Sequence, residues 1–275
     1  MKVLRAIGAF FARIGRWIRD TAWVQPLLIV GGIFLIIFSI PYLSKWVGSW
    51  FTSSDAALKY YQSHEVKLDD NDSNKATRLF DYLVAYEKGD EEGIEKGKKE
   101  FGSKFFISIV KEDCTDCKTC YSGFQTLQKN WNKGAYSDMD GDFKLYTIFG
   151  DVTDDDDKLI FSKEGGFYDR YSAVFEGIVG YFDEESGNDY PYVSNAGVSE
   201  TFYSNLKTWV EPDDNGVTTP TTFLVDTSKG DYASSFGVVS ILFNYTSGTG
   251  VSDNSYTKAN ELRDCWKQVG HFKAA

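Results

Sequence analysis

Two adjoining segments, Phe105-Phe-Ile-Ser-Ile-Val110 and Lys111-Glu-Asp-Cys114-Thr-Asp-Cys117-Lys-Thr-Cys120, decide how this chain folds. The first segment has the apolar, aromatic and β-branched composition of a buried strand. The second places a C-x-x-C pair where that strand passes into a helix, so the Cys114 sulfur lies near the helix N-terminus. Unpaired N–H groups and the helix dipole at that end favour a thiolate over a thiol. Because Cys117 follows one turn later, the pair predicts a reversible dithiol/disulfide switch.

The flanking sequence predicts an alternation of helices and strands. Before the cysteine pair and just after it, we expect helices over 44–62 and 74–101, a strand over 105–110, a helix to about Lys133 and a strand over 143–149. Further on, we expect helices over 167–183 and 199–210, strands over 219–226 and 236–245, and a closing helix over 254–272. The strand–helix–strand succession predicts a parallel pair, and the short connection between the last two strands predicts an antiparallel pair. The fold class is therefore α/β, with a mixed sheet flanked by helices.

Charge is divided unevenly along the 275 residues. Residues 1–23 carry +4 and the whole chain carries −11, so the remaining residues carry −15. Phosphate repulsion opposes the binding of nucleic acid by so acidic a domain. We interpret the acidity as a source of solubility for an exposed domain.

The segment 21–44 has no charged residue and contains the apolar run Leu27–Ile40, which predicts a transmembrane helix. Trp23 and Tyr42 suit the two membrane interfaces, and the basic residues before the span predict a cytoplasmic N-terminus. A cleaved signal peptide is the alternative, but Pro41 and the residues after it form a poor cleavage site. Residues 1–20 predict an amphipathic basic helix, which lies on the inner membrane face or packs on a partner membrane protein.

These patterns divide the chain into four parts. We expect a cytoplasmic amphipathic helix over 1–20, a transmembrane helix over 21–44, a juxtamembrane helical segment over 45–100 and an extracytoplasmic domain over 101–275. An extracytoplasmic compartment permits disulfides.

Neither a metal nor a cofactor is expected from the remaining motifs. The C-x-x-C-x-x-C run begins like a bacterial ferredoxin motif, but Phe124 stands where the fourth cysteine belongs. Zinc would need Cys265 or His271 as its fourth ligand. The acidic loop over 138–142 lacks the glycine spacing and the distal glutamate of an EF-hand.

Three features together resemble the thioredoxin superfamily. They are the strand that leads into Cys114 and Cys117, the Thr219-Pro220 step that opens a strand, and the strand followed by a helix at the end of the chain. The resemblance covers roughly 100–150 and 215–275 and implies a thioredoxin-like mixed sheet. The segment 150–215 is similar in position to the helical insertion of the periplasmic disulfide-oxidase branch.

The resemblance also implies roles for individual residues. Cys114 would be the nucleophile and Cys117 the resolving thiol, whereas Thr219 and Pro220 would bind the substrate peptide. In the family this proline is cis and lies beside the redox cysteines, and an X-Pro bond adopts cis at modest cost. A permanent structural disulfide in a non-catalytic domain is the alternative for the cysteine pair.

Several positions depart from the family pattern. Asp113 replaces the usual tryptophan, and Thr115-Asp116 replaces the usual Gly-Pro between the cysteines. Ser108 stands where the family has a buried carboxylate that manages the proton of the second cysteine, and Ser122 replaces the proline that kinks the helix. The redox element is therefore expected without its usual proton relay.

In this fold the cysteine helix and the last helix cover the same face of the sheet. Cys120 and Cys265 could therefore meet as a structural disulfide, and two buried thiols are the alternative.

The sequence thus predicts a membrane-anchored, extracytoplasmic thiol–disulfide oxidoreductase without a cofactor. Its expected partners are the lipid bilayer, extracytoplasmic proteins that contain cysteine, or a membrane redox partner. The alternative function is a non-catalytic thioredoxin-like scaffold or accessory subunit of a membrane export or conjugation-type complex. The departures around Cys114, the large insertion and the basic N-terminus favour this alternative.

Overall fold

The structure is a computed structural model that describes residues 53–68, 74–137, 139, 141–153, 157–182, 189–190, 200–212, 216–228, 233–243, 255–267 and 272–273. The basic helix expected over 1–20 and the span expected over 21–44 lie outside these residues. Within them, the helices are too short or too polar to cross a bilayer.

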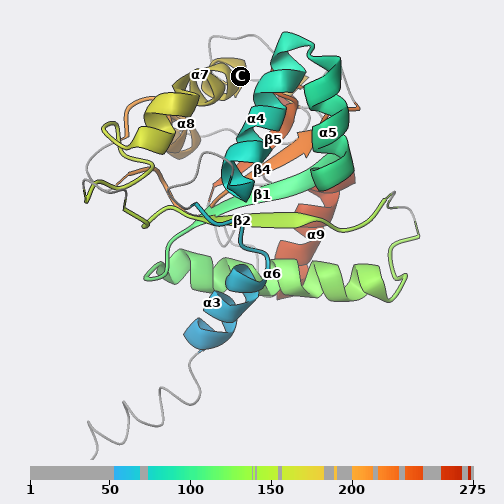
Figure 1. Ribbon diagram of the computed structural model, residues 1–275. Coiled ribbons are helices and arrows are strands. Elements are labelled where there is room, and N and C mark those ends of the chain that lie inside the picture. The colour runs from blue at the N-terminus through green and yellow to red at the C-terminus, as the bar shows by residue number, and fades with distance from the viewer. Residues whose placement is uncertain are drawn as a thin grey trace, which may run out of the picture. The chain divides into compact units, whose positions relative to one another are not determined.

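A four-stranded mixed sheet forms the centre of the domain (Figure 1). Its strands, in spatial order, are β2 (Leu145–Phe149), β1 (Lys104–Val110), β4 (Thr221–Asp226) and β5 (Val238–Phe243). β1 pairs parallel with β2 and antiparallel with β4, and β4 pairs antiparallel with β5. The parallel first pair and the antiparallel last pair predicted from the sequence are confirmed, and the arrangement is compatible with a thioredoxin-like fold.

Helices cover both faces of the sheet (Figure 1). The helices on one face are α6 (Thr115–Asn132) and α9 (Ser255–Lys267), and those on the other are α4 (Lys75–Lys88), α5 (Glu91–Phe101), α7 (Gly166–Phe182) and α8 (Glu200–Lys207). Alternation along β1 explains this division, because Phe105, Ile107 and Ile109 join one hydrophobic cluster whereas Phe106 and Val110 join the other. The sheet is therefore buried on both sides, as expected where one connection between strands is a helix.

The single helix expected over 74–101 is in fact two helices. Gly89 has a φ of +67° and ends α4 as a left-handed cap, which explains the break. α5 then folds back along α4, and Gly97 lies directly against the ring of Tyr82. α4 and α5 place Leu79 and Phe101 in the same hydrophobic cluster as the sheet. The described part of 45–100 thus shares the core of the domain.

The polypeptide before α4 adds to the sheet and to the helix layer. After α3 (Ser53–Ser63), the backbone N–H of Val66 donates to Thr147 O at 2.8 Å, and Thr147 N–H donates to His64 O at 2.9 Å. These bonds place a short parallel segment beside β2. α3 consequently lies next to α6, and Tyr61 joins the hydrophobic cluster beneath it.

Two short strands were not expected from the sequence. β3 (Asp189–Tyr190) and β6 (Phe272–Lys273) pair antiparallel as a separate two-stranded sheet. Two residues are too few to give a periodic signal. Phe272 therefore lies in a strand, not in the closing helix that was expected to reach it.

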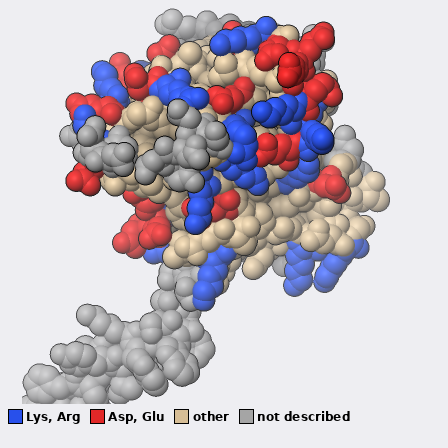
Figure 2. Space-filling model, viewed as in Figure 1, with Lys and Arg blue, Asp and Glu red and all other residues tan. Residues whose placement is uncertain are grey.

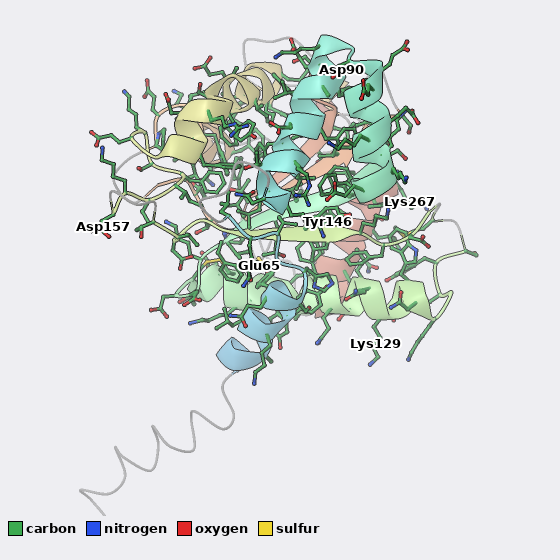
Figure 3. All side chains as sticks on the ribbon, in the orientation of Figure 1. Glu65, Asp90, Lys129, Tyr146, Asp157 and Lys267 are labelled. Atoms are coloured by element: carbon green, nitrogen blue, oxygen red, sulfur yellow. A yellow bond between two sulfur atoms is a disulfide. The ribbon has the colours of Figure 1, made fainter. Side chains whose placement is uncertain are left out.

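Two labelled side chains mark the opposite sides of the sheet. In Figure 3, Tyr146 of β2 lies on the side of α5, where its hydroxyl donates to Phe101 O at 3.0 Å, whereas Lys129 points outward from α6. Figure 2 shows acidic and basic side chains interspersed over the face where α4 and α5 lie. Exposed pairs there, such as Arg78 with Glu100 at 2.8 Å, add little to stability but keep the surface hydrated.

The close approach of α6 and α9 gives a direct test of this packing. A Cβ added at Gly123 of α6 would lie 2.6 Å from Lys258 Cβ of α9, whereas one added at Gly180 of α7 meets nothing within 4 Å. We expect Gly123→Ala to lower the free energy of unfolding by about 1–3 kcal/mol through overpacking. Gly180→Ala, the matched control, should raise it by about 0.5–1 kcal/mol because alanine is the better helix former. Denaturant unfolding measures both, and equal effects would contradict the close approach.

Candidate functional site

A disulfide between Cys114 and Cys117 lies at the N-terminus of α6, with an S–S distance of 2.05 Å and a Cα–Cα distance of 5.1 Å. Cys114 is the N-cap residue of the helix, and its Sγ accepts a hydrogen bond from the Cys117 backbone N–H at 3.0 Å. This N–H is one of the donors that a helix leaves without an intrahelical partner. In the reduced state the same bond would favour the Cys114 thiolate, because a donor aimed at sulfur stabilises its negative charge.

The two sulfurs differ in access. Cys114 is 9% exposed and Cys117 is 2% exposed, and both belong to the hydrophobic cluster beneath α6. Cys114 is therefore the more exposed residue of the pair. This order agrees with the roles that the resemblance implies, in which Cys114 reacts with the substrate and Cys117 resolves the mixed disulfide.

The strand pairing brings Thr219 and Pro220 to the disulfide. β4 runs antiparallel to β1, with Thr221 opposite Ile109, so the start of β4 meets the end of β1. The Thr219–Pro220 peptide bond is cis, the isomer that the resemblance implies. Thr219 O lies 3.8 Å from Cys114 Sγ. All four residues singled out for the redox site are thus side by side.

Both acidic and basic side chains lie near the disulfide, so neither sign of charge dominates there. The exposed Asp113 pairs with Lys118 at 3.7 Å, so these two charges largely offset each other's effect on Cys114. Asp151, just after β2, accepts a hydrogen bond from the Glu112 backbone N–H at 2.7 Å. This bond fixes the loop between β1 and α6. Asp151 was not singled out in the sequence, where it is part of an acidic loop without a pattern.

Hydroxyl groups occupy the sheet at the position where the thioredoxin superfamily, which the sequence resembles, has a carboxylate. Ser108 Oγ lies 3.1 Å from Thr222 Oγ1, and both residues are fully buried. By alternation with Phe106 and Val110, Ser108 faces the side of the sheet that α6 covers. A hydroxyl does not ionise near neutral pH, so this pair cannot take up the proton of Cys117 as a carboxylate does. The lack of an acidic relay stays a prediction, and the group that Ser108 contacts here is a second hydroxyl.

Cys120 and Cys265 are buried thiols and are not joined by a disulfide. α6 and α9 do pack on the same face of the sheet, but the structure shows the alternative that the sequence left open. Burial raises the pKa of the Cys265 thiol to about 12, although a hydrogen bond with Ser240 acts in the opposite direction. Among the described residues, no group of three or more His, Cys, Asp or Glu side chains could hold a metal ion.

A side chain from α3 contacts α6. The Tyr61 hydroxyl donates to Cys117 O at 3.0 Å, and Tyr61 is only 2% exposed. The Tyr60 ring lies near Tyr121 of α6, with centroids 6.3 Å apart. No local pattern predicts these contacts, because they join residues more than fifty positions apart.

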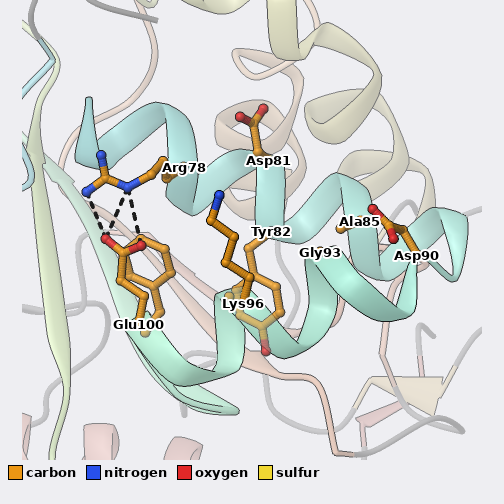
Figure 4. Close-up of a pocket in the computed structure, with 10 residues that line it drawn as sticks. Arg78, Asp81, Tyr82, Ala85, Asp90, Gly93, Lys96 and Glu100 are labelled. Atoms are coloured by element: carbon orange, nitrogen blue, oxygen red, sulfur yellow. Dashed lines mark hydrogen bonds and ion pairs between the residues drawn. The ribbon is translucent and has the colours of Figure 1, made fainter. Parts of the chain in front are cut away.

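A hollow lies between α4 and α5, on the face of the sheet opposite the disulfide (Figure 4). Arg78, Asp81, Tyr82, Lys96 and Glu100 are among the residues that line it. Figure 4 shows the Arg78 guanidinium turned onto the Glu100 carboxylate, a pair of hydrogen-bonded charges that occupies one end of the hollow. Paired surface charges of this kind offer no reactive group, so the disulfide is the better candidate site.

Comparisons with protein-family models, curated proteins and solved structures find no match for this chain. What the structure defines by itself is an α/β protein with a mixed sheet and a helix-capping C-x-x-C disulfide, a combination that weakly suggests a redox function.

The contact between α3 and α6 can be tested with two neighbouring tyrosines. Tyr61→Phe removes the hydrogen bond to Cys117 O, and we expect it to lower the free energy of unfolding by about 0.5–1.5 kcal/mol. The Tyr60 hydroxyl is buried without a hydrogen-bond partner in the described part of the chain, and burial raises the pKa of Tyr60. Tyr60→Phe should therefore leave stability unchanged or slightly higher. Denaturant unfolding that finds Tyr60→Phe the more damaging change would contradict these contacts.

The state of the four cysteines can be read by alkylation and peptide mapping. Without reductant or denaturant, we expect iodoacetamide at pH 8 to label none of them, because two are bonded and two are buried. Denaturant without reductant should expose Cys120 and Cys265, and reductant should be needed for Cys114 and Cys117. A peptide linked through Cys120 and Cys265 would overturn this assignment.

Proposed function

We propose that this protein is a thioredoxin-like thiol–disulfide oxidoreductase that acts through Cys114 and Cys117. The observation that carries the proposal is the placement of the Cys114 sulfur, which caps a helix and lies 3.8 Å from the backbone oxygen next to a cis proline. A C-x-x-C at a helix N-terminus is a favourable place for a reactive thiolate. The sheet order and the inserted helices α7 and α8 support membership of the thioredoxin superfamily.

The chemistry is a two-step exchange of disulfides. In the oxidised protein, a substrate thiolate attacks Cys114 Sγ, breaks the Cys114–Cys117 bond and releases Cys117 as a thiolate. A second substrate thiolate then attacks the substrate sulfur of the mixed disulfide and releases Cys114. The substrate is oxidised to a disulfide, and the protein gains two electrons and, at neutral pH, the protons of its two thiols. The same two steps in reverse reduce a substrate disulfide, and the protein then gives up two electrons and the protons of its two thiols.

The substrate would be an extended peptide segment that contains cysteine. Thr219 is partly exposed and lies beside the more accessible sulfur, so its backbone is available to pair with such a segment. Pro220 is buried and directly precedes β4, which holds the Thr219 backbone next to Cys114.

We further propose that the domain lies outside the cell, attached to the membrane by the apolar segment 21–44. The uncharged run Leu27–Ile40 and the basic residues before it support this topology. In that location the partners would be extracytoplasmic proteins with cysteines, or a redox protein of the same membrane.

A second candidate is a scaffold that retains the fold without turnover. The observation in its favour is the Ser108–Thr222 hydroxyl pair, which leaves the resolving Cys117 without an acid–base partner at that position. A scaffold of this kind would serve as a subunit of a membrane export or conjugation-type complex, with the disulfide as a permanent crosslink.

Turnover assays separate the two candidates. We expect the wild-type chain to catalyse the reduction of insulin by dithiothreitol and the oxidative refolding of reduced ribonuclease. Cys114→Ala should reduce both activities to the uncatalysed background, because no other accessible sulfur is available among the described residues. Cys120→Ala is the matched control, since it removes a buried sulfur from the same helix outside the pair, and it should retain activity.

A wild-type chain that is folded, reducible and inactive in both assays would refute the oxidoreductase and favour the scaffold.

A further inference from the structure

The inserted segment 150–215 contains α8, and a residue that follows this helix is hydrogen-bonded to the loop that carries the cis proline. Thr208 follows α8, and its Oγ1 accepts a hydrogen bond from the Thr218 backbone N–H at 3.1 Å. The same oxygen lies 3.1 Å from Thr218 Oγ1 and donates to Asn205 O at 2.7 Å. One hydroxyl group therefore ties the end of a helix to the residue that precedes Thr219.

Neighbouring groups reinforce this attachment. The Trp209 indole N–H donates to Thr221 Oγ1 at 3.4 Å, and Thr221 Oγ1 donates to Thr218 O at 2.6 Å. Trp209 is 1% exposed and packs against Phe175 of α7 and Phe223 of β4, with ring centroids 5.1 Å away in each case. The loop is thus held from the insertion side and from its own strand, with Thr208 as the partner that reaches the Thr218 N–H.

The position of this loop affects the sulfur directly. Thr219 O lies 3.8 Å from Cys114 Sγ. When the disulfide is reduced, a Cys114 thiol can donate to this carbonyl oxygen, whereas a thiolate would face its lone pairs. The contact therefore favours the protonated thiol and opposes the Cys117 N–H, which favours the thiolate.

We propose that Thr208 is a positioning residue, which holds the Thr218–Thr219 backbone against Cys114 and so sets the reactivity of the reduced cysteine. The proposal rests on the proposed function in that Cys114 is the reacting sulfur. It gives the segment 150–215 a role at the site, because the insertion supplies the hydroxyl that fixes the loop.

The charged groups around Cys114 also affect its reactivity, and a substitution at Thr208 does not alter them. They are Lys111, Glu112 and Asp113 before it, Asp116 and Lys118 on α6, Asp151 after β2, and the exposed Lys207 and Glu211 on either side of Thr208. Residues 216–221 contain no charged side chain. A substitution at Thr208 therefore changes the placement of a carbonyl dipole and leaves every charge in this set in place.

The pH dependence of alkylation tests the proposal in the full-length chain. The disulfide is first reduced, and the rate of iodoacetamide labelling at Cys114 is followed by peptide mass spectrometry from acid to alkaline pH. Thr208→Val keeps the shape of the side chain but removes the hydroxyl. We expect its half-maximal rate to move to lower pH by about half a unit, because the thiol loses a well-placed acceptor. Thr208→Ser restores the hydroxyl and should return the wild-type profile.

Thr227→Val is the matched control. Thr227 Oγ1 also joins separate segments, through Tyr82 OH at 2.8 Å and Ser103 O at 3.2 Å, but it lies at the opposite end of β4 from Pro220. This variant should lower the unfolding temperature without moving the Cys114 profile. An equal shift in Thr227→Val, or an unchanged profile in folded Thr208→Val, would overturn the proposal.

Two further outcomes are distinguishable. If Thr208→Val does not fold, Thr208→Ala removes the same hydroxyl without adding a second methyl group, and a shift in the same direction is expected. If the wild-type chain fails in turnover but the Thr208→Val profile still shifts, the proposed function is refuted while the positioning role stands.

Discussion

The antiparallel pairing of β1 with β4 is the constraint on which the rest of the structure depends. It places the residue opposite Ile109 at the start of β4, so the chain leaving β1 and the chain entering β4 occupy the same edge of the sheet. Cys114 and Pro220 meet there although more than one hundred residues separate them. A one-residue slip of this register would exchange the two faces of one strand, so that its side chains would meet the wrong hydrophobic cluster, and it would move the loop away from the sulfur. The hydrophobic alternation of β1 therefore fixes the site as well as the core.

The sequence predicted helices and strands best where a short local pattern coincides with an element of the buried core. The run Phe105–Val110 gave β1, and the C-x-x-C gave the start of α6, because strand composition and helix-end chemistry are both local. The break at Gly89 depends on a left-handed backbone. Glycine adopts this conformation easily, but the presence of a glycine does not by itself predict that a helix ends there. The strand at Phe272 could not be predicted from local sequence, because it has only two residues and is defined by its pairing with a distant segment.

The site could be predicted only in part for a related reason. Cys114, Cys117 and the Thr219–Pro220 step carry recognisable spacing, but the hydrogen bonds from Tyr61 and Thr208 do not. A threonine after a short helix has many possible partners, and nothing within its own segment selects the Thr218 N–H. Which hydroxyl reaches which backbone group is decided by how the helices pack, and that information is spread over the whole core.

The contacts that the structure gives to the Cys114 sulfur come from the backbone and not from charged side chains. Ser108 and Thr222 fill the interior with hydroxyls that stay neutral, and Asp113 with Lys118 largely offset each other at the surface. Among the described residues, the hydrogen-bonding groups near the Cys114 sulfur include the Cys117 N–H at 3.0 Å and Thr219 O at 3.8 Å. Backbone dipoles act strongly only at short range and in fixed orientation. A site built in this way depends on the rigidity of two loops, which is why groups distant in sequence hold each of them in place.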